Sequence, residues 1–519
     1  MGSDKTVIGI DIGTTSTKSV VFGMNGSVRG SCSIHYPLLH ERPSWAEQDP
    51  DAIVEAVTRS VKGAIEQSGI SGVDVAGASL SSAMHSVIAI DETGKPLTRS
   101  MTWADGRSEA EAQHIRQHVP DIYFRTGTPI HPMSPLPKLI WLRNNRTDVW
   151  ERAAKFVSIK EYVLFVLFGQ WAVDYSLASA TGLLNGQQLD WDEQALRLAG
   201  LETGRLSPLQ PGTYRMQGLS ADYAQRMGLG KETPFFLGGS DGAMANIGVG
   251  AIGPGEMAVT IGTSAAVRMM MDRPLTDERQ RTFCYHVADS SYVIGGAANN
   301  GGIVLQWLRE KMFAGGGFAG AGGSGAAGIE GRGSVEALLE EAAKVSPGAE
   351  GLLFLPFLTG ERAPIWNAEA RGTFFGANLG HGRGHFVRAG LEGVMLGVLS
   401  VAHALEDLAG PAVEVRASGG FTKSLLWRQM LADMLGQRVS IPRVTEASAL
   451  GAAAIAMQEL GELGHWSDIK SWIPIDEVLE PSAAAAKVYR ELLGIYTRLC
   501  GALAPAFAEI ADLQRKRSG

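Results

Sequence analysis

Residues 11–18, DIGTTSTK, place a carboxylate, a glycine, four hydroxyls and a lysine in one short turn. The turn lies between two apolar, β-branched runs, 7–10 and 19–22, which indicates a β-hairpin. A plain hairpin needs only a pair such as Asn-Gly or Asp-Gly. The extra polar groups therefore predict a ligand. Backbone N–H groups near a glycine, together with Thr and Ser hydroxyls, can bind phosphate, and an acid at a strand end can hold Mg²⁺.

A second stretch, AVTIGTSAAVRMM at 258–270, has the same order of strand, Gly-Thr turn and strand. Two copies of one hairpin in a chain indicate a duplicated domain. We expect the boundary between 248 and 255, which gives two domains, 1–250 and 251–519. Two such hairpins facing each other would hold a nucleoside triphosphate from two sides.

Asp241, in the segment GGSDG, is the candidate general base. It follows an apolar strand at 235–237 and two glycines, so it is expected to project from a strand end. Phosphoryl transfer needs positioned groups, neutralised charge and a base for the attacking hydroxyl. Further glycine pairs at 295–296, 301–302 and 419–420 predict close approach of backbone to a ligand.

The elements that must position these residues alternate short apolar strands with longer helical patterns, which is typical of an α/β fold. Strands are predicted at 7–10, 19–22, 76–80, 87–90, 235–237, 257–261, 265–270, 292–295 and 413–417. Helices are predicted at 50–67, 135–144, 159–168, 306–313, 335–345, 385–408, 424–435, 446–460 and 483–499. The glycine-rich tract 315–333 has little to bury and predicts a surface loop.

Composition narrows the class of protein. The chain has 519 residues, 45% of them hydrophobic and 19% charged, which indicates a globular protein of two or more domains. Its net charge is −8, and its basic run at 515–517 is short, so no nucleic-acid partner is expected. No uninterrupted apolar stretch reaches the ~18 residues of a membrane span. Three distant cysteines, Cys32, Cys284 and Cys500, predict neither disulfides nor a metal site. A cytoplasmic protein without a membrane partner is expected.

Short motifs along nearly the whole chain, in order, resemble those of the FGGY carbohydrate kinases of the actin-like ATPase superfamily. They are IDIGTTSTK (10–18), SSAMHS (81–86), TWADGRS (102–108), GTPIHPMSPLPKLIWL (127–142), GGSDGAMANIGVG (238–250), GGAANNGGIVLQWL (295–308), LPFLTGERAPIWNAEARGTFFG (355–376) and ASGGFTKSLLWRQMLADML (417–435). Within the family, AMHS, TWADGRS, TPIHPMSPL and AANNGGIVL are most similar to gluconate kinases. The resemblance implies two actin-like (ribonuclease H-like) ATPase domains with a cleft for nucleotide and substrate between them. It also implies ATP-dependent phosphorylation of D-gluconate at its 6-hydroxyl.

The same resemblance implies that Asp241 is the catalytic base and that Asp11 organises Mg²⁺ beside the phosphates of ATP. Nucleotide contacts are implied for Thr14, Thr15, Lys18, Gly262, Thr263, Gly302, Gln306, Gly419, Gly420 and Ser424. The glycines at 419–420 would let the adenosine lie against backbone. The residues after 300 open a helix, and the N-terminus of a helix favours an anion.

Substrate contacts are implied for Met84, His85, Trp103, Asp105 and Arg107, in addition to Asp241. Trp103 would form an aromatic wall beside the sugar. Gluconate is an anion, so a fixed cation is expected, and arginine can bind a carboxylate through two hydrogen bonds. Arg107 is our first choice for that cation.

Other residues are assigned by the same reasoning. Lys138, Lys160 and His85 are further candidates for the cation, and Arg107 has the alternative of pairing with Asp105 or Glu109. His131 and Pro132 are expected to be framework residues. Glu361 and Arg362 are interpreted as an ion pair that shapes the site.

Three other functions stay open at this point. The nearest is a xylulose kinase or another ketose or polyol kinase, although xylulose kinases usually have Gln where this chain has Ala83. Glycerol kinases have an Arg-Glu pair in place of Met84 and His85. An actin- or Hsp70-like ATPase would need no sugar motifs, and a silent sugar sensor would not need Asp11 and Asp241. The sequence also leaves a homodimer open.

Overall fold

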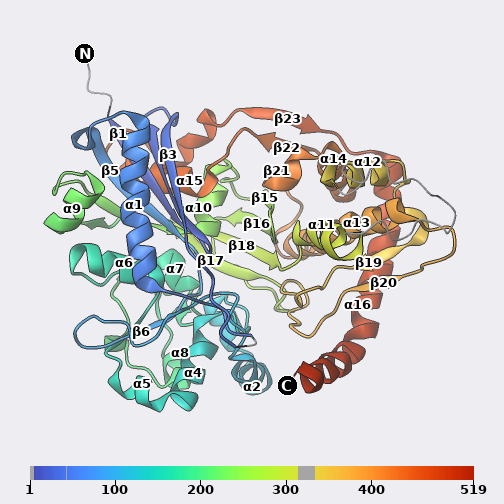
Figure 1. Cartoon of the computed structure of the whole chain (residues 1–519), viewed down its shortest axis with the longest axis horizontal. Coiled ribbons are helices and arrows are strands. Elements are labelled where there is room, and N and C mark those ends of the chain that lie inside the picture. The colour runs from blue at the N-terminus through green and yellow to red at the C-terminus, as the bar shows by residue number, and fades with distance from the viewer. Residues whose placement is uncertain (1–4, 43, 314–333, 519) are drawn as a thin grey trace, which may run out of the picture. The chain divides into compact units, whose positions relative to one another are not determined.

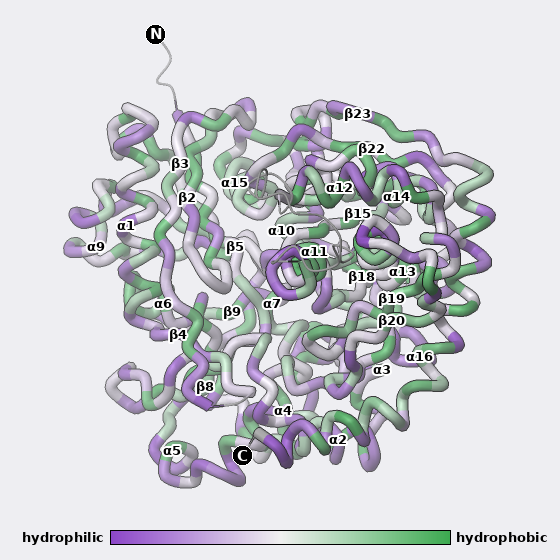
Figure 2. Tube along the Cα trace, turned by 45° about the vertical axis from the view of Figure 1, so that its right-hand side comes forward, coloured by the Kyte–Doolittle hydropathy of each residue, from purple (hydrophilic) through white to green (hydrophobic). Residues whose placement is uncertain are grey.

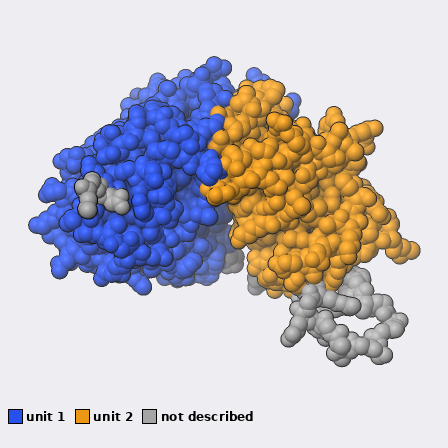
Figure 3. All heavy atoms as spheres, turned by 90° about the horizontal axis from the view of Figure 1, so that it is seen from above, with its two compact units in different colours: residues 1–254, 270–294, 444–474 blue, residues 255–269, 295–443, 475–519 orange. Residues whose placement is uncertain are grey.

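The structure, a computed structural model, describes residues 5–42, 44–313 and 334–518 (Figure 1). The glycine-rich tract 315–333 lies outside the described residues. The chain divides into two compact units, coloured separately in Figure 3. Unit 1 contains Met1–Pro254, Met270–Ile294 and Val444–Pro474, and unit 2 contains Gly255–Met269, Gly295–Arg443 and Ile475–Gly519. Two later segments of the chain therefore belong to unit 1, and the predicted continuous domains 1–250 and 251–519 stay a prediction.

Unit 1 is built on a six-stranded sheet with the order β13-β14-β5-β1-β2-β3. The predicted first hairpin is present, because β1 (Thr6–Ile12) pairs antiparallel with β2 (Ser16–Gly23). On its other side β1 runs parallel to β5 (Val75–Ser82), and β5 runs parallel to β14 (Phe235–Ser240). The carboxyl ends of three parallel strands therefore meet at one edge of the sheet, and Asp11 and Asp241 lie there.

The two faces of this sheet are covered by different helices. Ile8, Ile10 and Ile12 of β1 belong to one apolar cluster with residues of α1 (Pro50–Ser68), whereas Val7 belongs to a second cluster with residues of α15 (Ala447–Glu459). Alternate residues of a strand point to opposite faces, so this division follows directly from the sequence. Figure 1 shows α1 lying across the strands of the sheet.

Figure 2 shows hydrophilic stretches along two helices of unit 1, α5 and α9. The remaining elements of unit 1 complete the sheet or surround its core. They are β3 (Val28–His35), β4 (Glu47–Gln48), β6 (Ile88–Ile90), β7 (Ser100–Met101), α2 (Glu109–His118), α3 (Ile122–Thr126), α4 (Pro135–Asn145), α5 (Thr147–Arg152), β8 (Lys155–Val157), α6 (Ile159–Phe168), β9 (Val173–Asp174), α7 (Tyr175–Ser179), β10 (Leu184–Asn185), β11 (Asp190–Trp191), α8 (Glu193–Ala199), β12 (Leu209–Gln210), β13 (Arg215–Met216), α9 (Ala221–Met227), α10 (Asp241–Gly248) and β17 (Phe283–Ala288).

A second sheet has the strand order β17-β18-β16-β15-β21-β22-β23. In unit 2, β15 (Glu256–Ile261) pairs antiparallel with β16 (Ala265–Met271), as predicted, and runs parallel to β21 (Glu414–Ser418). Its other strands are β18 (Ser291–Ala298), β22 (Val439–Pro442) and β23 (Ile475–Leu479). A hairpin beside a parallel strand is also the arrangement of β1, β2 and β5, so the backbone repeats the pattern that the sequence repeats.

The helices of unit 2 differ from the prediction at two places. The predicted helix 306–313 is a short α11 (Ile303–Trp307) followed by a π-helical turn (Leu308–Met312). The last helix, α16 (Ala483–Ser518), continues through Pro505 beyond the predicted end at 499. The other elements are α12 (Val335–Ala343), β19 (Leu353–Leu355), β20 (Thr373–Phe375), α13 (Arg383–Ala409) and α14 (Leu425–Leu435).

Helix α13 is the one helix of the described residues that is long and apolar enough to cross a membrane. However, 78% of its apolar window is buried inside the protein. This is how the core helix of a folded domain is packed, and α13 supplies buried residues such as Leu391, Val394 and Leu399 to unit 2.

Helices α10 and α15 approach each other through glycines, and this contact generates a prediction. A Cβ added at Gly451 would lie 2.0 Å from the backbone oxygen of Met244. We expect Gly451→Ala to lower the midpoint of thermal unfolding, because overpacking a core costs about 1–3 kcal/mol. Gly501→Ala, where nothing lies within 4 Å, is the matched control and should leave the midpoint unchanged or raise it. Equal midpoints for both variants would contradict the close packing of α10 and α15.

Candidate active site

Asp11 lies at the carboxyl end of β1, directly opposite Ser81 of β5 in the strand register. The Ser81 hydroxyl donates a hydrogen bond of 2.8 Å to Asp11 Oδ1. Burial, followed by the negative charge of Asp241, raises the pKa of Asp11 to about 7. The Ser81 hydrogen bond and the charge of Lys18 act in the opposite direction. A carboxyl in this state favours binding of a cation, which would restore its ionised form.

Asp241 is the first residue of α10 and follows β14 directly. Ser240 caps the helix, since its hydroxyl accepts a 3.4 Å hydrogen bond from the amide of Ala243. The glycine before them is required by the backbone: Gly238 has φ +65°, and a Cβ there would lie 2.0 Å from the oxygen of Leu80. The segment GGSDG thus lets β14 pack closely against β5 and places a carboxylate in the first turn of a helix, where the helix dipole stabilises it.

Lys18 of β2 forms an ion pair with Glu446, the residue before α15. Glu446 also acts on Asp11, whose pKa it raises. Three carboxylates, those of Asp11, Asp241 and Glu446, and the ammonium of Lys18 therefore form one electrostatic cluster in unit 1. Sequence reasoning missed Glu446, because an acid at the start of a predicted helix is explained equally well by helix capping.

The turn of the first hairpin is connected to the predicted substrate residue Trp103. The indole Nε1 of Trp103 donates a 2.8 Å hydrogen bond to Thr14 Oγ1, and Gln48 Nε2 donates a 2.6 Å bond to the Thr14 carbonyl. Thr15 is exposed, while its carbonyl accepts a bond from the amide of Tyr36. The structure thus brings a predicted phosphate contact and a predicted sugar contact together.

His85 and Met84 lie in the loop after β5. His85 is 8% exposed, and its backbone has φ 70°, a left-handed conformation that is uncommon outside glycine. Its Nδ1 donates a 2.7 Å hydrogen bond to the carbonyl of Ala180. Met84 is partly buried and packs against the apolar clusters that contain Met244 and Leu177.

Arg107 is held by two acids of its own unit. It donates bonds of 2.8 and 2.7 Å to Asp105 and of 2.6 Å to Glu47. Its side chain is 4% exposed, and its guanidinium lies 3.5 Å from the ring centroid of Trp45. Asp105 in turn accepts a 2.8 Å bond from the amide of Ala46. The alternative to a substrate contact is a pair of Arg107 with Asp105 or Glu109 on the surface. The structure shows the pair with Asp105, but the pair is buried rather than on the surface. A substrate contact for either residue stays a prediction.

The two lysines considered as other cations lie in the core. The side chains of Lys138 and Lys160 are 0% and 1% exposed. His131 Nδ1 accepts a bond from the amide of Met133, and the carbonyl of Pro132 accepts one from Ser108. These local contacts suit the expected framework role of His131 and Pro132.

In unit 2, several predicted nucleotide residues converge. The amide of Gly302 donates a 2.7 Å bond to the carbonyl of Gly262, and the amide of Gly301 donates a 3.1 Å bond to that of Thr263. Gly419 has φ +105°, and a Cβ there would lie 2.3 Å from the oxygen of Ile261. The turn after β15, the start of α11 and the end of β21 are therefore packed together through glycine backbone.

Other predicted residues of unit 2 have local structural partners. Ser424 caps α14, because its hydroxyl accepts a 3.3 Å bond from the amide of Trp427. Gln306 donates a 3.2 Å bond to Glu310. Gly420 begins a short 3-10 helix, Gly420–Lys423. Roles for these three in nucleotide binding stay predictions.

Glu361 anchors the segment before α11. Its carboxylate accepts bonds of 2.6 Å from the amide of Asn299, 3.1 Å from the side chain of Asn300 and 2.9 Å from the amide of Arg362. Burial raises the pKa of Glu361, whereas the charge of Arg362 lowers it. Glu361 thus supports the backbone next to Gly301 and Gly302 directly, and its ion pair with Arg362 stays a prediction.

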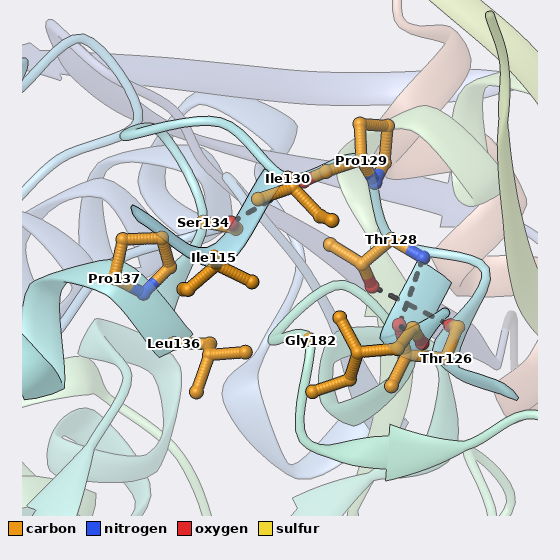
Figure 4. Close-up of a pocket in the computed structure, with 10 residues that line it drawn as sticks. Ile115, Thr126, Thr128, Pro129, Ile130, Ser134, Leu136, Pro137 and Gly182 are labelled. Atoms are coloured by element: carbon orange, nitrogen blue, oxygen red, sulfur yellow. Dashed lines mark hydrogen bonds between the residues drawn. The ribbon is translucent and has the colours of Figure 1, made fainter. Parts of the chain in front are cut away.

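A small cavity beside α4, shown in Figure 4, is not a candidate for the substrate site. Ile115, Leu136, Pro137 and Gly182 line it, and its volume is about 10 Å³. This is room for roughly one water molecule. Among the described residues no group of three or more His, Cys, Asp and Glu could hold a metal ion. Mg²⁺ normally binds through one or two carboxylates, waters and substrate phosphates, so Asp11 in its cluster suits that mode.

Two sheets, each with a Gly-Thr hairpin beside a parallel strand, form a two-domain α/β fold that matches those of sugar kinases. The N-terminal domain model of the FGGY family of carbohydrate kinases matches residues 6–248, and the C-terminal domain model matches residues 257–460. The chain belongs to the FGGY family of carbohydrate kinases.

Individual relatives cover almost the whole chain. A gluconokinase of Bacillus subtilis (strain 168) is 45% identical, over 98% of this chain and 98% of its own. The crystal structure of a gluconate kinase from Lactobacillus acidophilus matches with a TM-score of 0.90 and 34% identity, over 98% of this chain and 99% of the other. The structure of a ligand-bound xylulose kinase from the same organism matches with a TM-score of 0.91 and 34% identity, over 98% and 100%.

The contacts of Arg107 generate a prediction that separates support of the fold from substrate binding. Removing one partner of a buried ion pair leaves a buried charge and costs about 3–5 kcal/mol. We therefore expect Arg107→Ala to lower the midpoint of thermal unfolding clearly. Arg146→Ala, which removes an exposed pair with Asp148, should change it little. An unchanged midpoint in Arg107→Ala, together with a tenfold higher KM for the sugar, would instead make Arg107 a direct substrate contact.

Proposed function

We propose that this chain transfers the γ-phosphoryl group of ATP to the 6-hydroxyl of D-gluconate and so forms 6-phosphogluconate. The observation that carries this proposal is the 45% identity to a gluconokinase over 98% of both chains. The residues of SSAMHS and TWADGRS, which resemble those of gluconate kinases, support it further. We place the enzyme in the cytoplasm, in keeping with its three free cysteines.

In this proposal the carboxylate of Asp241 accepts the proton of the 6-hydroxyl as the hydroxyl oxygen attacks the γ-phosphorus. The new O–P bond forms while the bond to the β,γ-bridging oxygen breaks, and ADP leaves. Asp241 lies in the first turn of α10, where the positive end of the helix dipole favours a negative charge. Met84, His85, Trp103, Asp105 and Arg107 are the proposed sugar-binding set or its immediate support.

Asp11 and Lys18 are proposed to act on the phosphates. Mg²⁺, when bound, neutralises phosphate charge and needs oxygen ligands such as the carboxylate of Asp11. Lys18 would exchange its partner Glu446 for phosphate oxygens. Thr14 and Thr15, followed in unit 2 by Gly262, Thr263, Gly302, Gln306, Gly419, Gly420 and Ser424, complete the proposed nucleotide contacts.

A second candidate is a kinase for xylulose or a related ketose. The likeness to a ligand-bound xylulose kinase, with a TM-score of 0.91 and 34% identity, favours it. Both candidates use the same phosphoryl-transfer chemistry, and they differ only in the sugar that is bound.

An ATP-coupled assay with gluconate, xylulose, ribulose and glycerol tests the proposal. We expect the highest kcat/KM for gluconate, at least about tenfold above the neutral sugars, since charge-assisted hydrogen bonds to its carboxylate add about 1.5–3 kcal/mol. A higher kcat/KM for xylulose than for gluconate would make xylulose, and not gluconate, the substrate. Hydrolysis of ATP that no sugar stimulates would contradict a sugar kinase.

Asp241→Asn tests the general base. We expect kcat to fall by about 10²–10⁴, because removal of a general base has this typical effect, while binding of ATP is retained. Asp222→Asn on the surface of α9 is the control and should keep wild-type turnover, since its side chain is 71% exposed. Near wild-type turnover in Asp241→Asn would end the assignment of the base.

The raised pKa of Asp11 generates a prediction of pH dependence. Below about pH 7 the neutral acid predominates, and a neutral carboxyl binds Mg²⁺ poorly. The Mg²⁺ concentration for half-maximal activity should therefore rise as the pH falls from 8 to 6, by up to about tenfold per unit below the pKa. Asp11→Asn should need more Mg²⁺ at every pH and lose this dependence. If the Mg²⁺ requirement of Asp11→Asn changes with pH as it does in the wild type, a group other than Asp11 is responsible.

A further inference from the structure

Two lysines of unit 1, Lys138 of α4 and Lys160 of α6, are almost completely buried. Lysine is rarely buried, because an ammonium loses its hydration unless the protein replaces every hydrogen bond. An ammonium has three N–H donors and no acceptor. The partners of these donors show which parts of the protein each lysine holds.

Lys138 holds three separate segments together. Its Nζ donates bonds of 2.8 Å to the carbonyl of His85, 2.6 Å to that of Thr102 and 2.7 Å to that of Met133. These carbonyls belong to the loop after β5, the segment after β7 and the loop before α4, part of which is drawn in Figure 4. The first two segments carry Met84, His85 and Trp103, which are proposed sugar contacts.

The bond to His85 fixes a backbone that is not in its preferred conformation. His85 has φ 70°, and such a residue persists only where its surroundings determine it. Its imidazole is held by the carbonyl of Ala180 and its own carbonyl by Lys138. Burial lowers the pKa of Lys138 to about 7, but three carbonyl acceptors favour the ammonium, because a neutral amine has only two N–H donors.

Lys160 holds a different element, the end of β14. Its Nζ donates bonds of 2.8 Å to the carbonyl of Leu237 and 3.1 Å to that of Gly239, and forms a 2.6 Å ion pair with Asp174. Gly239 is two residues before the proposed base, Asp241.

The segment that follows Asp174 supports the same strand end. Asp174 caps α7 by accepting a 2.9 Å bond from the amide of Leu177. The hydroxyl of Ser176 in α7 accepts a 3.1 Å bond from the amide of Ser240 and donates to its hydroxyl. The backbone before Asp241 is thus held from α6 through Lys160 and from α7 through Ser176.

We propose that the two buried lysines are positioning residues with separate tasks. Lys138 fixes the loops that bind the sugar, and Lys160, paired with Asp174, fixes the strand end that carries the base. The proposal rests on the sugar-kinase function proposed above. It also excludes Lys138 and Lys160 as direct ligands of the substrate carboxylate, because each ammonium already has three protein acceptors.

Steady-state kinetics of Lys138→Met and Lys160→Met test this division, since methionine keeps the length of the side chain and removes its donors. We expect Lys138→Met to raise KM for the sugar at least about tenfold and to change kcat less than about threefold. Lys160→Met should lower kcat at least about tenfold with a nearly unchanged KM for the sugar. KM for ATP should stay within about threefold in both.

Lys155→Met is the matched control. Lys155 Nζ also donates to two backbone carbonyls, those of Gly204 and Leu206, at 3.1 and 2.9 Å, but that loop carries none of the proposed site residues. Its kcat and KM should equal those of the wild type. Equal effects of all three variants on kcat and KM would show that the lysines only stabilise the fold, and would overturn the proposal.

Two milder variants serve if a methionine variant does not fold. Lys138→Arg keeps the charge but carries its donors on a longer, planar group, and Asp174→Asn removes the charge of the ion pair while keeping an acceptor for Leu177. Lys138→Arg should mainly raise KM for the sugar, and Asp174→Asn should mainly lower kcat. If these variants also fail to fold, or lack the split, the positioning roles are wrong. Wild-type protein without sugar phosphorylation contradicts the proposed function, whereas active wild-type protein without the split contradicts the positioning roles alone.

Discussion

Two carboxylates, Asp11 and Asp241, end strands of one sheet in unit 1, and the repulsion between them is the constraint on which the site depends. The parallel pairing of β1, β5 and β14 places them at the same edge of the sheet. Burial, and after it the negative charge of Asp241, raises the pKa of Asp11 to about 7. A carboxyl whose ionised form is disfavoured in this way would gain free energy from a bound divalent cation, which is the role proposed for Mg²⁺.

The strand ends can carry these charges because their backbone is held rigidly. Gly238 allows β14 to approach β5, since a Cβ there would lie 2.0 Å from the oxygen of Leu80. Gly9 allows a similar close approach between β1 and helix α15, since a Cβ there would lie 2.0 Å from the oxygen of Ala449. Lys160 fixes the carbonyls of Leu237 and Gly239 from the side of α6. These backbone contacts therefore restrict the position of the Asp241 carboxylate.

The sequence predicted the parts of this arrangement whose signals are local. Alternating apolar residues and a Gly-Thr turn sufficed for both hairpins, and the apolar strand before GGSDG sufficed for the position of Asp241. Three partners could not be predicted because they are distant in sequence: Glu446 for Lys18, Glu47 for Arg107 and the carbonyl of His85 for Lys138. Ser424 shows the opposite difficulty: a serine before an apolar helix is a helix cap on local grounds, whatever it also binds. For Arg107 the nearby acid Asp105 was among the predicted partners, whereas Glu47 was not, because it lies 60 residues away in the sequence.

The four hydroxyls of the first hairpin do not share one purpose. Thr17 is fully buried and bonded to Tyr36, whose hydroxyl donates a 2.7 Å bond to the carbonyl of Gly13, so it stabilises the turn itself. Thr14 is bonded to Trp103, whereas the side chain of Thr15 is exposed. A polar turn of this kind combines residues that build the turn with residues left available for the proposed nucleotide, and residue type alone does not separate the two.

The ion pair between Lys18 and Glu446 affects how much Lys18 can contribute to binding of a phosphate. The ammonium of Lys18 has an anionic partner in Glu446, so in the proposed function a phosphate that replaced Glu446 would exchange one charge-assisted contact for another. The net gain in affinity from Lys18 is then smaller than that of an unpaired lysine, because the existing contact must first be broken. At the same time Glu446, once released, adds its negative charge to Asp11 and Asp241. In the proposed function this charge would favour phosphate that arrives together with Mg²⁺ over phosphate alone, because the metal ion offsets the repulsion from the carboxylates.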